Sequence, residues 1–151
     1  MDYTIIIDTR EQLKIPFKNF EVATLQTGDY SIKGYENLIS IERKSAIDLY
    51  GTLGKGNKRF KKELERSMDL EYFAIVVEDN FQNIRNKTFE NSHFSKMKGY
   101  VITQILCTIH VKYNIPVFFT NNQYESKILI KDLFKAYLKN KSVVIQPKEE
   151  S

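Results

Sequence analysis

The chain has 151 residues, of which 42% are hydrophobic and 28% are charged, and its formal net charge at pH 7 is +4. This length is enough for one domain with a buried core, and the composition excludes a disordered or fibrous protein. No apolar stretch approaches the ~20 residues that span a bilayer, no secretory signal is recognisable, and Cys107 is the single cysteine. We therefore expect an intracellular protein without a disulfide or a membrane partner, cytoplasmic in a bacterium or phage and nuclear in a eukaryote.

Four strands are predicted in the first 44 residues. The β-branched run at 3–7 predicts a central strand, and within the irregular segment that follows it, residues 20–25 favour a short strand. Residues 29–33 and 38–44 predict two more strands, which the turn-forming segment 34–37 joins into a hairpin.

Alternation along the second strand of this hairpin determines which charged side chains share a face. Glu42 and Lys44 are two residues apart and therefore point to the same face, whereas Arg43 points to the other. Asp29 lies at the start of the neighbouring strand and can reach the face of Glu42 and Lys44. We expect these three side chains to meet.

Helices and strands alternate in the rest of the chain. Ser45 is a suitable N-cap for a helix that begins near Ala46 and that glycines at 51, 54 and 56 interrupt. The later elements are predicted as a helix at 57–70, a buried strand at 73–77, a long polar loop at 80–95, a helix at 97–113, a strand at 116–119 and a helix at 124–138. This order predicts one α/β domain over residues 1–147, with a mixed central sheet flanked by helices on both faces and a frayed tail at 148–151.

Acidic and basic side chains gather where the apolar segments of the first 50 residues begin or end. A charge beside a buried core costs roughly several kcal/mol unless an opposite charge offsets it. Mg²⁺ and Mn²⁺ can supply that charge, and they prefer carboxylate and other oxygen ligands. The sequence predicts Asp29 and Glu42 as ligands of such an ion, with the backbone carbonyl of Arg43 as a further ligand.

Lys44 completes a pattern suited to phosphodiester hydrolysis. A lysine beside metal ligands can orient or deprotonate the attacking water, or neutralise charge in the transition state. An acid on one strand followed by acid-x-Lys on the next is the PD-(D/E)-x-K pattern, which Asp29, Glu42 and Lys44 match. Taken alone, Asp29 after Gly28 is more typical of a turn residue; the combination favours the metal site.

The fuller pattern resembles the nuclease domain of the XPF family of structure-specific endonucleases. Gly28-Asp29, Glu42-Arg43-Lys44 and Asp48 are similar at every position to the family's G-D and E-R-K-x-x-x-D signature, and Asp8-Thr9-Arg10-Glu11 precedes them. The helical segment from 57 and the strand at 73–78 are similar to the family's next elements. The resemblance implies a restriction-endonuclease-like fold, Mg²⁺-dependent cleavage with Mn²⁺ able to substitute, and branched, flap or fork DNA as substrate.

The resemblance also implies roles for individual residues. Asp29, Glu42 and Lys44 would be catalytic, the two acids as metal ligands, and Asp8 would be a further catalytic acid and ligand near a second metal.

Supporting roles are implied for Arg10, Glu11, Arg43 and Asp48. From the residues alone, Arg10 and Glu11 can equally pair with each other or with neighbours, and Arg43 fits a structural ion pair better than a catalytic contact. Asp48 fits either a favourable charge at a helix start or support of Lys44.

A basic segment follows the predicted site. Residues 55–66 hold six basic and two acidic side chains, and a patch of this kind is what DNA would meet first. We predict that Lys55, Lys58, Arg59 and Lys62 contact DNA phosphates. From charge alone, a solvated helix face is an equal alternative.

The sequence thus predicts an endonuclease that cuts DNA near branches. One alternative is a Holliday-junction resolvase of the same superfamily. Another is a non-catalytic DNA-binding or dimer-partner module, although such a module would be free to lose the acids and the lysine that this chain retains. The resemblance further implies a homodimer through the two C-terminal helices, and we expect a partner protein to supply the DNA grip that a helix-hairpin-helix module provides in many family members.

Overall fold

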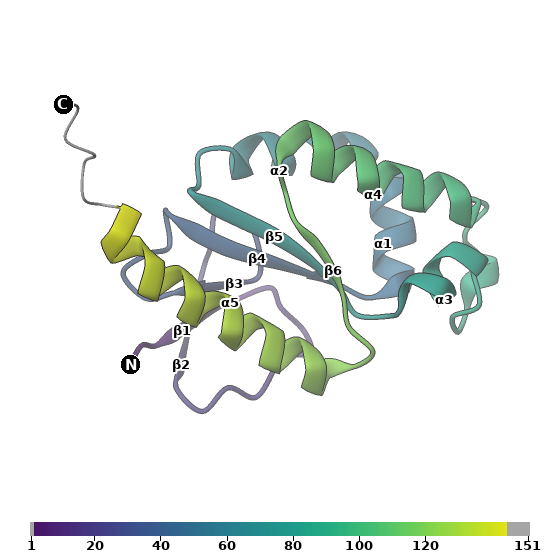
Figure 1. Cartoon of the computed structure of the whole chain (residues 1–151). Coiled ribbons are helices and arrows are strands. Elements are labelled where there is room, and N and C mark those ends of the chain that lie inside the picture. Colours follow the sequence, from purple (N-terminus) through teal and green to yellow (C-terminus); the bar gives the residue numbers. More distant parts are fainter. Residues whose placement is uncertain (1, 145–151) are drawn as a thin grey trace.

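The computed structural model describes residues 2–144, with side chains up to residue 141. Six strands form one sheet in the order β2-β1-β3-β4-β5-β6 (Figure 1). They are β1 (Ile5–Asp8), β2 (Phe20–Ala23), β3 (Tyr30–Ile32), β4 (Ile39–Lys44), β5 (Tyr72–Val77) and β6 (Val117–Phe119). Strand β3 pairs antiparallel with β1 and β4, whereas β1–β2, β4–β5 and β5–β6 are parallel pairs. The predicted mixed sheet is confirmed.

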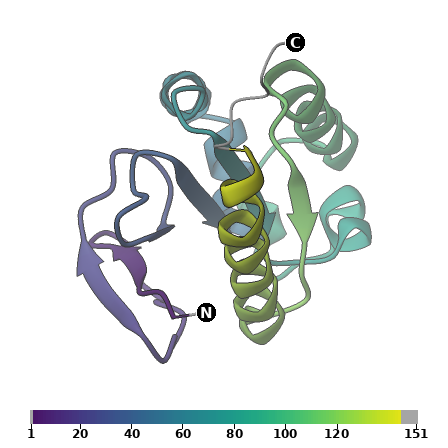
Figure 2. The same ribbon diagram turned by 60° about the vertical axis from the view of Figure 1, so that its left-hand side comes forward.

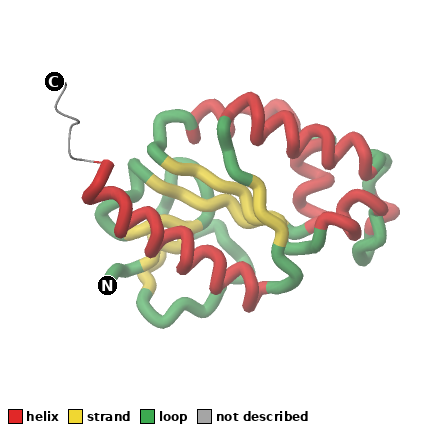
Figure 3. Tube along the Cα trace, viewed as in Figure 1, coloured by secondary structure: helices red, strands yellow, loops and turns green. Residues whose placement is uncertain are grey.

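Helices surround this sheet (Figure 3). Those in the described part of the chain are α1 (Ala46–Leu53), α2 (Asn57–Ser67), α3 (Phe81–Asn86), α4 (Gly99–Tyr113) and α5 (Gln123–Val144), with a 3₁₀ turn, η1, at Ser92–Phe94. Within residues 2–144, none of them combines the length and the apolar character that crossing a lipid bilayer requires.

Both faces of the sheet are covered by helices, as the sequence predicts. In Figure 1 the sheet lies between α5 and a layer that contains α1, α2 and α4, and Figure 2 shows this arrangement after a turn of the molecule. Alternate residues of β5 point into the two layers: Ile75 and Val77 belong to the hydrophobic cluster under α1, α2 and α4, whereas Ala74 and Val76 belong to the cluster under α5. A strand that is apolar on both faces is typical of the parallel part of such a sheet.

The segment 80–95 differs from its prediction as a long loop, because it contains α3 and η1. The side-chain carbonyl of Asn80 accepts a hydrogen bond of 2.7 Å from the backbone N–H of Asn83 and so caps α3. A single buried residue, Ile84, anchors this short helix in the core. One apolar anchor gives too weak a periodicity to predict a helix from the sequence.

Element boundaries also differ from their predictions, most of them by one or two residues and those of three helices in ways that change the element. Helix α1 continues through Gly51 and ends at Leu53, with Gly54 as its C-cap, so the predicted interruption at Gly51 is wrong. Helix α5 continues past residue 138 to Val144, and α2 ends at Ser67 instead of 70. The predicted domain end at 147 and the tail at 148–151 lie outside the described residues.

Candidate active site

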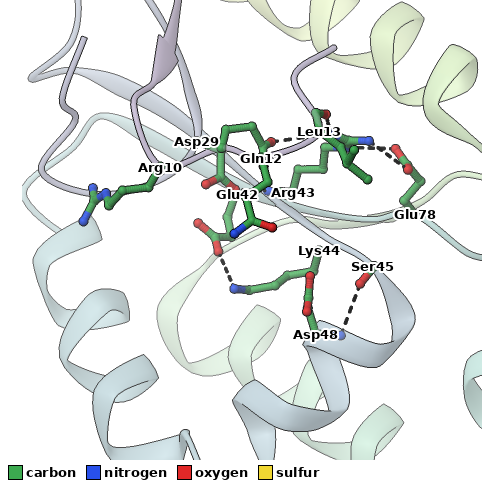
Figure 4. A pocket seen from close by; sticks show the side chains of 11 residues that line it. Arg10, Gln12, Leu13, Asp29, Glu42, Arg43, Lys44, Ser45, Asp48 and Glu78 are labelled. Atoms are coloured by element: carbon green, nitrogen blue, oxygen red, sulfur yellow. Dashed lines mark hydrogen bonds and ion pairs between the residues drawn. The ribbon is translucent and has the colours of Figure 1, made fainter. Parts of the chain in front are cut away.

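A cavity of about 330 Å³ opens at the C-terminal end of β4, where the charged segments of the first 50 residues converge (Figure 4). Its lining residues are Arg10, Glu11, Gln12, Leu13, Asp29, Glu42, Arg43, Lys44, Ser45, Asp48 and Glu78. The structure therefore brings Asp29, Glu42 and Lys44 to one cavity. The alternation and the hairpin predicted from the sequence account for this convergence.

Asp29 is placed by the glycine before it and by hydrogen bonds to β4. Gly28 has φ +81°, and a Cβ there would overlap the side chain of Ser40, so only glycine fits. The N–H of Asp29 donates to the carbonyl of Ile41 at 2.8 Å, and its Oδ2 accepts from the N–H of Arg43 at 2.8 Å. Its carboxylate is consequently fixed against the strand that carries Glu42.

Glu42 and Lys44 share a face of β4, as the alternation predicts. Their register opposite Ile75 and Val77 of β5 directs both side chains toward the layer of α1 and α2. Lys44 Nζ lies 2.8 Å from Glu42 Oε2, and the two side chains are 18% and 5% exposed. This nearly dry ion pair forms one wall of the cavity.

The cavity carries more negative charge than its neighbours neutralise. Burial, helped by the nearby charge of Glu11, raises the pKa of Asp29 to about 7, against the hydrogen bond from Arg43. Burial also raises the pKa of Glu42, and Asp29 adds to the shift. Burial lowers the pKa of Lys44, but Glu42 more than offsets this and the pKa of Lys44 is raised. A protonated lysine and buried carboxylates that lack a full counter-charge are a donor set that suits a hard divalent cation.

Arg43 points away from the two acids and holds the structure around them (Figure 4). Its Nε and Nη2 donate to the carboxylate of Glu78 at 2.9 Å each, and its Nη1 donates to the carbonyl of Leu13 at 2.5 Å. This bidentate geometry fits the structural ion pair that the sequence favoured. The proposed ligand role of its backbone carbonyl stays a prediction.

Asp8 lies beside Asp29 in the sheet, where its N–H donates to the carbonyl of Asp29 at 2.8 Å, but its carboxylate is bound by other groups. Its expected place near a second metal stays a prediction. Its Oδ1 accepts from the N–H of Leu25 at 2.8 Å, and its Oδ2 accepts from Nε of Arg10 at 2.8 Å. Its side chain is 2% exposed and does not line the cavity. Among the side chains up to residue 141, no group of three or more His, Cys, Asp or Glu is arranged to hold a metal ion. The geometry gives Asp8 a structural part, with Arg10 as its main partner.

The remaining predicted supporting residues, Glu11 and Asp48, both line the cavity. Oε2 of Glu11 is buried and has no hydrogen-bond partner among the described residues, although Nη1 of Arg43 lies 3.5 Å away. The N–H of Asp48 donates to Ser45 Oγ at 3.2 Å, which confirms Ser45 as the N-cap of α1, and Figure 4 places the Asp48 side chain beside Lys44. An orphaned carboxylate oxygen at this position is consistent with a site that binds a cation.

The four predicted DNA-contacting residues lie outside the cavity. All four are exposed, one on the turn before α2 and three on α2 itself: Lys55, Lys58, Arg59 and Lys62. Phe60 and Leu64 anchor the opposite side of that helix in the core. Their contact with DNA phosphates stays a prediction.

Three residues near the site were missed by sequence reasoning. Glu63 on α2 adds to the charge that raises the pKa of Asp29 and Glu42, and its spacing from the buried Phe60 could have indicated a sheet-facing position. Gln12 and Leu13 line the cavity from a loop whose sequence carries no signal of this kind.

Comparison with known proteins places this geometry in a family. The ERCC4 domain model matches residues 7–133. A protein of Methanocaldococcus jannaschii that bears the name of an ATP-dependent RNA helicase, MJ1505, is 30% identical over 146 residues. That alignment covers 93% of this chain and 17% of the archaeal protein, so this chain corresponds to a small part of its relative.

Solved structures agree with this assignment. XPF from Aeropyrum pernix superposes with a TM-score of 0.68 at 18% identity, over 88% of this chain and 60% of that one. The same protein in complex with DNA gives a TM-score of 0.70 at 18% identity, over 91% and 66% of the two chains. At this identity the likeness concerns the fold, and it confirms the predicted restriction-endonuclease-like architecture and the resemblance to the XPF nuclease domain. The chain belongs to the ERCC4 domain family.

Proposed function

We propose that this chain is a metal-dependent DNA endonuclease that hydrolyses phosphodiester bonds near branched, flap or fork structures. The observation that carries the proposal is the meeting of Asp29, Glu42 and Lys44 in one open cavity of an ERCC4 domain. The DNA bound to A. pernix XPF supports DNA as the partner.

The carboxylates of Asp29 and Glu42 would hold Mg²⁺, with Mn²⁺ as a substitute. Oδ2 of Asp29 already accepts a hydrogen bond from Arg43, which leaves Oδ1 as its less occupied oxygen. Oε2 of Glu11 accepts no hydrogen bond among the described residues and lies 3.5 Å from Nη1 of Arg43. Such an ion supplies charge neutralisation at the phosphate that is cut.

Lys44 serves as a charged donor in this proposal. Because Glu42 holds its pKa above the ordinary value, the ammonium group stays protonated at neutral pH. A protonated Nζ can donate to a phosphate oxygen or to the attacking water and can offset charge in the transition state. Ser45 and Asp48 fix the start of α1 directly beyond it.

The test compares labelled flap, fork, four-way-junction and continuous duplex DNA with Mg²⁺ or Mn²⁺. We expect the wild type to cut branched DNA and Asp29→Ala and Lys44→Ala to lose at least ~100-fold in rate. Asp69→Ala, an exposed acid outside the cavity, is the matched control. Undiminished cutting by Asp29→Ala and Lys44→Ala would overturn the site.

The same substrates distinguish the alternatives. Symmetric paired nicks in four-way junctions would identify a Holliday-junction resolvase. Binding without cleavage under every divalent metal would identify a non-catalytic module.

We also propose a homodimer through α4 and α5. Large apolar side chains are exposed on both helices: Tyr100 and Val111 on α4, and Tyr124 and Ile128 on α5. The two helices lie on opposite faces of the sheet, but they directly precede and follow its edge strand β6. Exposed apolar side chains on both sides of a sheet edge are typical of interfaces. Light scattering should give the mass of a dimer for the wild type and the mass of a monomer for Val111→Glu. Phe94→Glu on η1 is the control and should stay dimeric, and a monomeric wild type would overturn the dimer.

A partner protein that supplies further DNA binding stays a prediction.

A further inference from the structure

Leu13 is an apolar side chain exposed at the mouth of the candidate active site. It is 75% exposed and lines the same cavity as Asp29 and Glu42. Its neighbours Gln12 and Lys14 are polar and exposed. Exposure at this level means that the leucine adds little to the stability of the fold and that its side chain is free to contact a bound molecule.

Hydrogen bonds fix the backbone at Leu13 and at Ile15, two residues later. Its carbonyl accepts a hydrogen bond of 2.5 Å from Nη1 of Arg43 and one of 3.5 Å from Nε2 of Gln123 at the start of α5. Two residues later, Ile15 is buried, and its N–H donates to the hydroxyl of Tyr30 at 3.1 Å.

The Arg43 side chain that binds the carbonyl of Leu13 is itself fixed in place. The Arg43 side chain is 8% exposed and is fixed by its two hydrogen bonds to Glu78. Its strand, β4, also carries Glu42. The exposed side chain of Leu13 is therefore presented at a defined position relative to the acids.

The chemistry of a leucine limits what it can contact in DNA. Phosphates are bound by cations and N–H donors, and the side chain of Leu13 offers neither. Its favourable partner is an apolar surface, and the face of a base is the largest one that DNA offers. In a continuous duplex the base faces are stacked on each other, whereas at a fork or flap the last base pair exposes one face. Leucine is among the side chains that proteins insert at opened base steps.

We propose that Leu13 packs against the exposed face of the base pair at the branch, next to the phosphate in the cavity, and is a specificity-determining residue for opened DNA. This inference rests on the proposed nuclease function and names the feature of the substrate that the site selects.

The first experiment compares cleavage of a fork and of a continuous duplex of the same sequence. We expect Leu13→Ala to lower the ratio of fork to duplex kcat/KM about tenfold. Leu13→Met keeps an apolar wedge and should retain the ratio. Met68→Ala, an exposed apolar residue at the end of α2, is the matched control. A wild-type ratio in Leu13→Ala overturns the role of Leu13 and leaves the nuclease proposal intact.

A second readout does not need cleavage. Two proteins are bound to a fork that carries 2-aminopurine at the branch: the variant Asp29→Asn, and the double variant that combines Asp29→Asn with Leu13→Ala. The change in 2-aminopurine fluorescence on binding, caused by the contact of Leu13 with the base, should be at least about twofold smaller without Leu13 at saturating protein. If the wild type cuts no DNA, the proposed function fails and this fluorescence difference decides the role of Leu13; equal fluorescence overturns it.

Discussion

The N–H of Arg43 donates a hydrogen bond of 2.8 Å to Oδ2 of Asp29, so one acid of the candidate site is bound directly to the strand that carries the other. An asparagine carbonyl could accept the same hydrogen bond. One substitution can therefore remove the charge of Asp29 and keep its hydrogen bond from Arg43.

We expect Asp29→Asn to preserve the fold and to lose stabilisation by metal. The variant keeps the acceptor for Arg43 and removes a buried charge, so without metal at about pH 8 it should melt no lower than the wild type. Mg²⁺ at about 100 times its Kd should stabilise the wild type by about 2.7 kcal/mol and leave the variant unchanged. Thermal melts with and without Mg²⁺ measure both effects, with Asp69→Asn as control. An equal response to Mg²⁺ in wild type and variant would show that Asp29 is not a ligand.

The stability of the metal-free protein should depend on pH through Asp29. Burial raises its pKa from 3.8 to about 7, so between these values the folded chain holds more protons than the unfolded chain. This contribution is fully present below 3.8 and is lost as the pH rises through 7. Denaturant titrations should show the free energy of unfolding of the wild type falling relative to Asp29→Asn between about pH 5 and pH 8. A constant difference across that range would contradict the shift.

Gly28 and Gly34 offer a matched pair of substitutions. Both have positive φ, +81° and +90°, but a Cβ at Gly28 meets the buried Ser40 whereas one at Gly34 meets open space. We expect Gly34→Ala to cost about 1 kcal/mol for the backbone conformation alone. Gly28→Ala should cost at least about 2 kcal/mol more, because Ser40 and β4 must move. Urea unfolding monitored by circular dichroism measures both; equal costs would contradict the tight fit at Gly28.

The basic side chains of α2 can be tested through the salt dependence of DNA binding. If Lys58 and Arg59 each contact one phosphate, replacing either with alanine should reduce the slope of log K against log salt by about 0.9. Lys135→Ala, an exposed lysine on α5, is the control. Fluorescence anisotropy of a labelled fork at several salt concentrations gives the slopes. Unchanged slopes would favour the solvated helix face.

The parts of the site that follow from local periodicity could be predicted from the sequence. Glu42 and Lys44 share a face because successive side chains of any strand alternate, and the short turn at 34–37 brings Asp29 to the neighbouring strand. Ser45 caps α1 through the backbone N–H of Asp48, only three residues away. Each of these relations depends on residues close in the sequence.

Asp8 shows where such prediction ends. Whether its carboxylate is free depends on the N–H of Leu25, 17 residues away, and on the rotamer of Arg10. The residues of the motif indicate neither of these contacts. The same holds for Leu13, whose place at the cavity depends on a hydrogen bond from Arg43 across 30 residues.

Chain order gives the site a sequence of assembly during synthesis. Every residue that lines the cavity comes from positions 10–48 except Glu78, at the end of β5. The hairpin of β3 and β4 joins Asp29 to Glu42 through short-range contacts, which close quickly, whereas β5 must dock before Arg43 can reach Glu78. The last lining residue to be synthesised is thus Glu78, the carboxylate that fixes Arg43 and, through Arg43, the backbone of Leu13.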